Sequence, residues 1–280
     1  MRIASIGGGP AGLYFAILMK RLRPDCEVTV HERNRADDTF GWGVVFSDET
    51  LGNFEEADPE SFEEIRANFA YWEAIDTFYG DTRVRSVGHG FCGLARKKLL
   101  EIFHGRCRDL GVELVFESEV RGLADVGPAD LILAADGLNS VVRKQYEEHF
   151  RPSLDWRSCR FAWLGTTRPL DAFTFIFREN EHGLFQVHAY PFQRGAEPMS
   201  TFIVECHEDT WRRAGLYRAT EEQTDAYCAE LFADHLDGHP LLTNRSIWRS
   251  FPTVTNERWS HGNVVLIGDS AHTAHFSIGS

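Results

Sequence analysis

The spacing of apolar residues at the start of the chain changes twice, in an order that predicts a strand, a helix and a second strand. RIASI at residues 2–6 is a short run typical of a buried strand. LYFAILMKRLRP at 13–24 has the length and apolar content of a helix that packs on a sheet. CEVTVHER at 26–33 is the next expected strand. This order favours an α/β fold with a doubly wound, Rossmann-like sheet.

Three later segments continue the same pattern. LARKKLLEIFHGRCRDLG at 94–111 has helical periodicity, and VELVFESEV at 112–120 and ADLILAADG at 129–137 are expected to be strands that follow it. GNVVLIGDSAH at 262–272 is again an apolar strand that runs into a loop. We expect this last segment to rejoin the first domain, so that the domain is discontinuous.

Between about 155 and 210 the apolar positions alternate, which predicts an antiparallel sheet. RFAWLGTT, FTFIFREN, LFQVHAY and MSTFIVEC are aromatic and β-branched runs separated by turn residues. One helix is expected next, opened by a capping box of Thr220 and Gln223 and closed near Gly238. The expected division is a first domain of 1–70, 94–153 and 259–280, and an inserted β-sheet domain of 71–93 and 154–258.

Composition narrows the class of protein. The chain has 280 residues, 43% of them hydrophobic, as an ordinary globular protein has. Strand residues begin at Arg2, without a signal peptide, and no apolar run approaches the roughly 18 residues of a membrane span, so we expect a cytoplasmic protein without membrane partners. The net charge of −13 disfavours nucleic acid. Six scattered cysteines without metal-ligand spacing predict packed, reduced thiols.

The stretch GGGPAG at residues 7–12 lies between the first expected strand and helix. In that place Gly7 permits a tight turn, Gly9 lets the backbone approach a pyrophosphate, and Gly12 lets the helix pack closely on the strand. Such motifs need an acidic residue about 20 positions further on, at the end of the second strand. Glu32 is that residue. The pattern therefore predicts a dinucleotide site, the alternative being a glycine-rich turn with a solvated glutamate.

Two further motifs follow buried strands. LILAADGLNSVVR places the pair Asp136 and Gly137 after a strand, with Arg143 at helical spacing beyond it, and VVLIGD places Gly268 and Asp269 after another. A first GxGxxG, an internal DG and a late GD in this order resemble the fingerprints of the single-component FAD-dependent aromatic hydroxylases. Either short motif alone would mean little, because Asp-Gly turns are common.

Less generic strings indicate a subgroup. GWGVVFS at 41–47, FIFREN at 175–180, HAYPF at 188–192, MSTFIVEC at 199–206 and HFSIGS at 275–280 resemble the subgroup that contains salicyloyl-CoA 5-hydroxylase, 2-aminobenzoyl-CoA monooxygenase and the violacein-pathway tryptophan hydroxylase. Members of this subgroup continue beyond the last of these strings. We therefore expect a fragment that lacks the C-terminal helices of its family.

The resemblance implies an activity. NAD(P)H would reduce FAD, O2 would add to the flavin as a C4a-hydroperoxide, and one oxygen atom would pass to an aromatic ring activated by a hydroxyl or amino group. The expected substrate is a small aromatic molecule of the salicyloyl-CoA or 2-aminobenzoyl-CoA type, which is a CoA thioester. Within the same fold the alternative substrate is a tryptophan or indole derivative, and the non-enzymatic alternative is an inactive FAD-binding fragment.

The resemblance also implies roles for single residues, none of them metal ligands. His275 and His188 are the expected catalytic residues and Tyr190 the expected substrate contact, with a structural histidine and a core tyrosine as the alternatives. The expected cofactor contacts are Gly7, Gly9, Pro10, Ala11, Gly12, Glu32, Arg33, Gly43, Val44, Arg96, Asp136, Gly137, Arg143, Gly268 and Asp269.

Other flavoprotein classes of related fold fit less well. A disulfide oxidoreductase needs a neighbouring pair of cysteines, which this sequence lacks, and a flavin halogenase needs a WxWxIP string, which it also lacks. The choice between NADH and NADPH is open at this point.

Overall fold

The computed structural model describes residues 1–274, which form two units built from separate stretches of chain. Unit 1 contains residues 1–38 and 99–156 and the chain from Pro252 onward. Unit 2 contains residues 39–98 and 157–251. Each unit has its own sheet.

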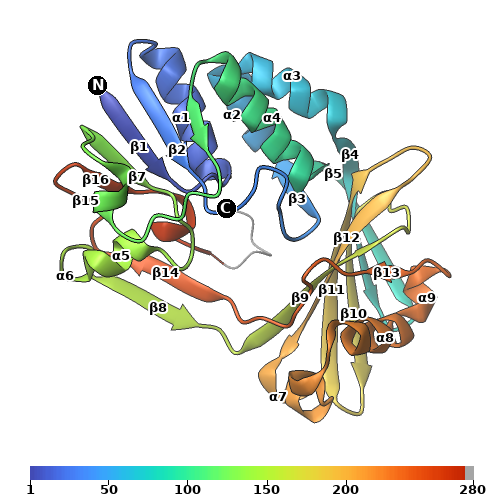
Figure 1. Cartoon of the computed structure of the whole chain (residues 1–280). Coiled ribbons are helices and arrows are strands. Elements are labelled where there is room, and N and C mark those ends of the chain that lie inside the picture. The colour runs from blue at the N-terminus through green and yellow to red at the C-terminus, as the bar shows by residue number, and fades with distance from the viewer. Residues whose placement is uncertain (275–280) are drawn as a thin grey trace. The chain divides into compact units, whose positions relative to one another are not determined.

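Unit 1 is built on a six-stranded sheet with the order β15-β16-β7-β1-β2-β6. Its neighbouring strands are parallel except for the pair β15 and β16. Figure 1 shows β1 and β7 side by side, with α1 beside β1 and β2. The strands are β1 (Arg2–Ile6), β2 (Glu27–His31), β6 (Glu113–Val115), β7 (Leu131–Ala134), β15 (Ser260–His261) and β16 (Val264–Leu266).

The central strand β1 is buried because its residues face apolar neighbours on both sides. Ile3, Ala4 and Ile6 are almost fully buried, and Leu13 and Ile17 of α1 are completely buried. The first expected strands and helix are confirmed, whereas the strand expected over 112–120 is only the short β6. The remaining elements of unit 1 are α1 (Pro10–Leu22), most of α4 (Arg96–Asp109), α5 (Val141–Gln145), α6 (Glu147–Phe150), the 3-10 turns η1 (Leu123–Val126) and η3 (Gly268–Ser270), and the ribbon of β8 (Pro152–Trp156) with β14 (Pro252–Asn256).

Unit 2 is built on an eight-stranded sheet with the order β13-β9-β12-β11-β10-β4-β5-β3. All neighbours are antiparallel except β4 and β10, so the period-two prediction for this part of the chain is confirmed. The strands are β3 (Gly43–Ser47), β4 (Ala70–Tyr79), β5 (Thr82–Ala95), β9 (Cys159–Thr166), β10 (Phe173–Asn180), β11 (Gly183–Gln193), β12 (Met199–His207) and β13 (Leu241–Leu242).

Helices α7, α8 and α9 cover one face of this sheet and bury its core. Phe185, Val187 and Ala189 of β11 pack with Cys228 and Phe232 in one buried cluster. Because side chains alternate along a strand, the even-numbered residues of β11 point to the opposite face. The helices of unit 2 are α2 (Asp48–Ala57), α3 (Pro59–Asn68), α7 (Glu208–Arg213), α8 (Glu221–Leu231) and α9 (Ala233–Leu236), with a 3-10 turn η2 (Leu216–Arg218).

The capping box predicted at Thr220 is present, but the helix it opens is shorter than expected. The Thr220 hydroxyl accepts from the Gln223 N–H at 3.2 Å, and the Gln223 side chain accepts from the Thr220 N–H at 3.0 Å. The helix breaks at Phe232, so the segment expected to be one helix up to Gly238 is α8 followed by α9.

The expected division of the chain differs from the observed one in residues 39–70 and 94–98, which belong to unit 2. The reason is that β3 pairs with β5 over its whole length, from Gly43 opposite Ala95 to Ser47 opposite Phe91. At the other boundary, residues 154–156 and 252–258 belong to unit 1, because β8 pairs with β14. Local periodicity does not reveal either pairing.

The GWG stretch at 41–43, which leads into β3, packs closely on β9 and β11 of the same unit. A Cβ at Gly41 would lie 2.7 Å from the ring of Trp163, and a Cβ at Gly43 would lie 2.6 Å from Phe192. In the reverse direction, a Cβ at Gly165 would lie 2.6 Å from the Trp42 ring. Trp42 therefore fills space against a glycine of the sheet, as expected for a packing residue.

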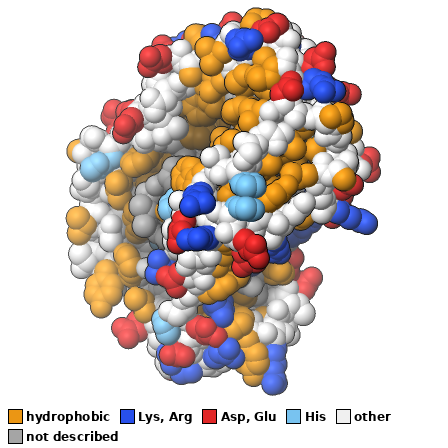
Figure 2. All heavy atoms as spheres, turned by 90° about the vertical axis from the view of Figure 1, so that its left-hand side faces the viewer, with side chains coloured by type: hydrophobic (Ala, Val, Ile, Leu, Met, Phe, Trp, Pro, Cys, Tyr) orange, Lys and Arg blue, Asp and Glu red, His pale blue; other side chains and the backbone are white. Residues whose placement is uncertain are grey.

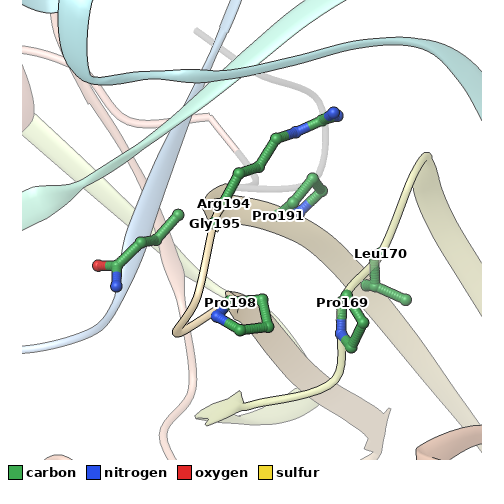
Figure 3. A pocket seen from close by; sticks show the side chains of 7 residues that line it. Pro169, Leu170, Pro191, Arg194, Gly195 and Pro198 are labelled. Carbon is green, nitrogen blue, oxygen red and sulfur yellow. The ribbon is translucent and has the colours of Figure 1, made fainter.

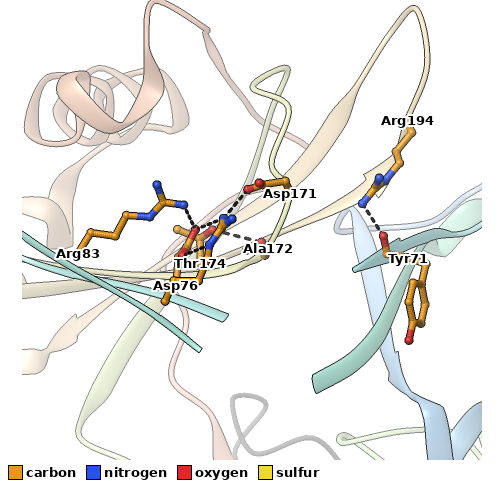
Figure 4. A network of polar contacts seen from close by, with 8 residues as sticks. Tyr71, Asp76, Arg83, Asp171, Ala172, Thr174 and Arg194 are labelled. Carbon is orange, nitrogen blue, oxygen red and sulfur yellow. Dashed lines mark hydrogen bonds and ion pairs between the residues drawn. The ribbon is translucent and has the colours of Figure 1, made fainter. Parts of the chain in front are cut away.

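A buried carboxylate joins β4 to β5 (Figure 4). The Asp76 side chain is 4% exposed and accepts from Arg83 at 2.8 Å and, in a bidentate contact, from Arg85 at 2.7 Å and 2.7 Å. Arg85 also donates to Asp171 at 2.9 Å. Burial alone would raise the pKa of Asp76, but the two guanidinium groups outweigh it and hold that pKa below its usual value.

The charged side chains and the cysteines lie where the composition leads one to expect them, the charges on the surface and most thiols in the interior. Figure 2 shows acidic and basic side chains interspersed on the face that it presents. All six cysteines are free, and five are buried. Among the helices of residues 1–274, none has the length and apolar character that crossing a membrane requires.

Candidate functional site

Three loops of unit 1 meet at the carboxyl ends of neighbouring parallel strands. The first follows β1, the second follows β7 and the third follows β16. In open α/β sheets the ligand binds outside this end of the strands. The candidate site is therefore the place where residues 7–12, 136–143 and 268–270 come together.

The first loop is shaped by two glycines that leave no room for a side chain. Gly7 has φ +107°, and a Cβ there would lie 2.2 Å from the Ala135 carbonyl oxygen. A Cβ at Gly12 would lie 2.2 Å from the Gly7 carbonyl oxygen. The loop is thus folded tightly against the end of β7, in the way that the sequence motif predicts.

Gly9 is different, because it faces open space. Apart from Gly9 itself and its two neighbours in the chain, no heavy atom of the described residues lies within 4 Å of a Cβ built at Gly9. Gly9 is also the N-cap of α1, without a side-chain cap, and the first turn, which begins with Pro10, has no acidic residue. A helix start with uncapped N–H groups and a positive dipole end suits an anion such as a pyrophosphate.

Glu32 lies directly after β2 and is held by the first loop. One carboxylate oxygen accepts from the Gly8 N–H at 2.8 Å, and the other accepts from the N–H and the side-chain amide of Asn34 at 2.8 Å and 2.7 Å. The carboxylate is therefore fixed beside the glycine loop. Arg33, the next residue, is exposed.

The second loop contains a carboxylate with one satisfied oxygen and one unsatisfied oxygen. Asp136 Oδ2 accepts from the N–H groups of Val141 at 2.7 Å and Val142 at 3.3 Å, and so caps α5. Asp136 Oδ1 is buried and has no hydrogen-bond partner among residues 1–274. A buried acceptor of this kind is costly unless a ligand or water donates to it.

Arg143 connects the second loop with the third. Its side chain is 2% exposed, and it donates to the carbonyl of Ser270 at 2.9 Å, to the carbonyl of Asp269 at 3.5 Å and to the carbonyl of Leu138. Burial lowers the pKa of this guanidinium, and the charge of Asp136 opposes the shift. Arg143 therefore positions both loops through their backbone.

The third loop is anchored to the sheet and to α1. The Ser270 hydroxyl donates to the Ala134 carbonyl at 2.6 Å, at the end of β7. Gly268 has φ +63°, and a Cβ there would lie 2.9 Å from Cβ of Ala11 in the first turn of α1. The Asp269 side chain is exposed. The three motifs, which lie more than a hundred residues apart in sequence, thus form one constellation.

We expect Arg143→Met to lower the free energy of unfolding by about 1–2 kcal/mol, because the carbonyls of Leu138 and Ser270 lose their charged donor. Removal of a buried charge offsets part of that loss. Urea unfolding of the natural chain and the variant measures the difference. Arg108→Met is a suitable control, since Arg108 is exposed in α4, and equal midpoints for all three proteins would contradict the positioning role.

The other expected site residues belong to unit 2. Gly43 donates its N–H to Thr201 at 3.1 Å and accepts from the Tyr190 hydroxyl at 2.9 Å, and the Arg96 guanidinium lies 4.9 Å from the centre of the Phe40 ring. Val44 is half-buried on β3. The cofactor contacts proposed for Gly43, Val44 and Arg96 stay predictions.

The expected substrate and catalytic residues lie on one strand, apart from His275, which falls outside the described residues. His188 is buried on β11 with its ring edge-on to Phe175, 5.1 Å between centroids. Tyr190 is 5% exposed and stacks on Trp72 and Phe173. Its hydroxyl is already bonded within unit 2, which favours the packing alternative for Tyr190.

Sequence reasoning did not find two residues that hold the site together. Asn34 fixes Glu32, and Ser270 links the third loop to β7. The only available signal was their position, two residues after Glu32 and directly after Asp269. Neither residue type in such a place predicts a particular hydrogen bond.

The comparisons with known proteins agree with this geometry. The family model described as "FAD binding domain" matches residues 111–279, which is more than half of the chain. The chain belongs to the FAD binding domain family. Its cofactor is accordingly FAD, and the fold is that of the FAD-dependent monooxygenases with a Rossmann-like domain and a sheet domain.

Several curated relatives are similar over the whole chain. Salicyloyl-CoA 5-hydroxylase of Streptomyces sp is 44% identical over all of this chain, which spans 55% of that protein. Protodeoxyviolaceinate monooxygenase of Chromobacterium violaceum is 33% identical, and 3-hydroxy-4-methyl-anthranilyl-[aryl-carrier protein] 5-monooxygenase of Streptosporangium sibiricum is 36% identical. The chain spans 75% and 74% of these two proteins. The chain therefore spans about half the length of salicyloyl-CoA 5-hydroxylase, the first of these relatives.

Solved structures support the fold. The tetrameric form of 2-methyl-3-hydroxypyridine-5-carboxylic acid oxygenase aligns with a TM-score of 0.76 and 20% identity over 97% of this chain and 75% of its own. PqsL of Pseudomonas aeruginosa, a probable FAD-dependent monooxygenase, aligns with a TM-score of 0.72 and 16% identity over 100% of this chain and 81% of its own. At these identities the likeness concerns the fold alone.

The residues of unit 1 fit FAD. The uncapped N-terminus of α1 beside Gly9 would suit the pyrophosphate, and the unsatisfied Oδ1 of Asp136 would suit a hydroxyl of the ribityl or ribose chain. The cofactor contacts of single residues stay predictions.

Proposed function

We propose that the protein is an FAD- and NAD(P)H-dependent monooxygenase that hydroxylates the activated aromatic ring of a thioester of the salicyloyl-CoA or 2-aminobenzoyl-CoA type. The observation that carries this proposal is the 44% identity to a salicyloyl-CoA 5-hydroxylase over the entire chain. A second relative, named for a carrier-bound anthranilyl substrate, is also a ring monooxygenase of a thioester-linked aromatic acid.

Unit 1 holds the cofactor in this proposal. The first turn of α1, from Gly9 to Gly12, takes the pyrophosphate through its N–H groups. Glu32 accepts from the adenosine ribose, and Asp136 and Asp269 accept from the hydroxyls of the ribityl side. When bound and reduced, FAD supplies the activation of O2 and the delivery of one oxygen atom to the ring.

The face of the unit 2 sheet opposite α7, α8 and α9 provides a surface that can exclude water, which such chemistry needs. Trp163 of β9, Ile203 of β12, His188 of β11 and Phe175 of β10 lie in one row across the sheet, as the strand registers show. The row is apolar and aromatic except for His188. In the proposed reaction the rings orient a planar substrate and exclude water, and His188 hydrogen-bonds the hydroxyl or amino group of the ring.

The test is oxygen-dependent NAD(P)H oxidation with three substrates: salicyloyl-CoA, 2-aminobenzoyl-CoA and an indole derivative. We expect one of the two thioesters to accelerate oxidation and to gain one oxygen atom, seen by mass spectrometry. Comparing the amount of hydroxylated product formed with NADH and with NADPH also identifies the reductant. Acceleration by the indole derivative alone would move the protein to the class of the 33% identical relative.

A separate outcome concerns catalysis itself. If the chain binds FAD but no substrate accelerates NAD(P)H oxidation, it is an FAD-binding unit without hydroxylase activity, and the enzymatic proposal is wrong. His188→Ala serves as the matched variant, because His188 is the sole polar side chain of the described row. We expect this variant to form less hydroxylated product than the natural chain and to bind the same amount of FAD.

A further inference from the structure

Unit 2 contains a surface pocket of about 310 Å³ that the cofactor site does not explain. Figure 3 shows Pro191 beside Arg194, and Pro169 and Leu170 on the segment across from them. The apolar wall consists of Pro169, Pro191 and Pro198 with Leu170. The polar residues are Gln193 at the end of β11, and Arg194 and Gly195 in the turn that follows it.

The pocket exists because two neighbouring strands end at different levels. Strand β10 begins at Phe173 and its last pair with β11 is Thr174 with Ala189, so Pro191 lies where β11 has no partner on that side. Proline is tolerated in a strand at such an edge because it has no N–H to offer. A bulge between Pro191 and Gln193 then interrupts the pairing with β12 and changes the direction of the side chains.

Arg194 carries a positive charge at this pocket without an acidic partner. Its one polar contact among residues 1–274 is a hydrogen bond from Nη2 to the carbonyl of Tyr71 (Figure 4). The side chain is exposed, and no Asp or Glu is among the residues that line the pocket. Other donors of the guanidinium, Nε and Nη1, are therefore available to an anion.

Gln193 adds an acceptor to the same pocket. Its side-chain N–H donates to the Glu197 carbonyl at 2.8 Å, which fixes the amide and leaves its oxygen for a ligand. The pocket thus combines proline rings, an amide acceptor and a planar cation. This set suits a ligand with an alkyl and amide body and a phosphate group, because guanidinium binds phosphate in a bidentate geometry.

We propose that this pocket binds the phosphorylated pantetheine arm of an aryl thioester, with Arg194 on the phosphate, Gln193 on an amide N–H and the prolines against the alkyl segments. The inference rests on the proposed function, since CoA and carrier-protein thioesters share this arm. A protein with a net charge of −13 repels a polyanion in general, so a cation without a carboxylate partner matters for binding it.

The experiment measures binding, without turnover, by isothermal titration of the chain with CoA, with pantetheine that lacks phosphate, and with a phosphopantetheine-bearing aryl-carrier protein. We expect Arg194→Met to weaken binding of CoA about tenfold, which corresponds to the loss of one charge-assisted hydrogen bond. The difference should shrink at high salt, because the contact is exposed. Pantetheine should bind weakly and equally to both proteins.

Two variants make the result specific. Arg218→Met removes the same charge from an exposed arginine of η2 that does not line the pocket, and it should bind CoA like the natural chain. Gln193→Glu keeps the shape of the side chain and adds a negative charge, so it should weaken CoA more than pantetheine. Circular dichroism of each variant verifies folding.

The outcomes separate this proposal from the proposed function. Binding of CoA alone, or of the carrier protein alone, identifies the source of the arm and supports the pocket when Arg194→Met weakens it. CoA affinity that is equal in the natural chain and Arg194→Met, or absent in both, overturns the pocket, even if a thioester is hydroxylated. Arg194-dependent binding without any hydroxylation supports the pocket while the proposed activity fails.

Discussion

Gly9→Val is expected to fold like the natural chain and to bind FAD more than a hundredfold more weakly. The variant folds because, beyond the two neighbours of Gly9 in the chain, the described residues have no atom within 4 Å of a Cβ at this position. It loses FAD because the added methyl groups occupy the space that the pyrophosphate needs, at the helix start whose N–H groups bind it. Flavin content after gel filtration and a fluorescence titration with FAD measure the effect.

Two other substitutions define the meaning of that result. Gly105→Val in α4 also enters open space, but away from the loops, and should retain FAD. Gly12→Ala should instead lower stability, because its Cβ would lie 2.2 Å from a backbone oxygen of Gly7. Normal FAD affinity in Gly9→Val would show that the glycine loop does not hold the pyrophosphate.

Asp76→Asn is expected to lower the free energy of unfolding by about 2–3 kcal/mol at neutral pH, because Arg83 and Arg85 lose a charged acceptor that is buried between two strands. The figure is below the full cost of breaking a buried ion pair, since the arginine side chains are 49% and 36% exposed and water screens them. Denaturant unfolding gives the difference. Asp81→Asn, at an exposed position of the turn that follows β4, is the control.

The same carboxylate predicts a dependence on pH. The pKa of Asp76 is lower in the folded protein than in the unfolded chain, so its contribution is complete above the unfolded pKa, which is about 4, and is lost as the pH falls through the folded pKa. The stability difference between the natural chain and Asp76→Asn should therefore shrink below about pH 4. A difference that stays constant down to pH 2.5 or so would exclude the carboxylate as its source.

The motifs of unit 1 were predictable because each depends on a local rule. Gly7 and Gly12 occupy a strand-to-helix turn with no room for a Cβ, and any chain that makes this turn needs glycine at these positions. Aromatic and β-branched runs between turn residues likewise predict β9 to β12; burial alternates along β10, whereas β12 is buried on both faces. For these turns and strands, the residues next to each other in the sequence are enough to predict the local structure.

Contacts between distant segments were not predictable. The pairing of β3 with β5 moves residues 39–70 into unit 2, and Asp76 meets its arginines only once β4, β5 and the β10 connection are side by side. Glu32 was found as the acidic residue of the motif, but its bonds to Gly8 and Asn34 depend on the loop conformation. The local pattern of a single sequence does not indicate which strands pair when they are far apart along the chain.

The position of β1 in the middle of its sheet also affects the order in which the site can form. β1 is made first, yet its neighbour β7 begins at Leu131, and β16, which carries the third loop, begins at Val264 after the whole β9 to β12 sheet has been synthesised. Bringing together strands that are this far apart in sequence costs conformational entropy. Parallel strands cannot be joined by a short hairpin that would avoid this cost. On the ribosome β1 can pair with β2 early, but its edge towards β7 stays unpaired until Leu131–Ala134 has been made, and the third loop joins the other two only after β16 has been made.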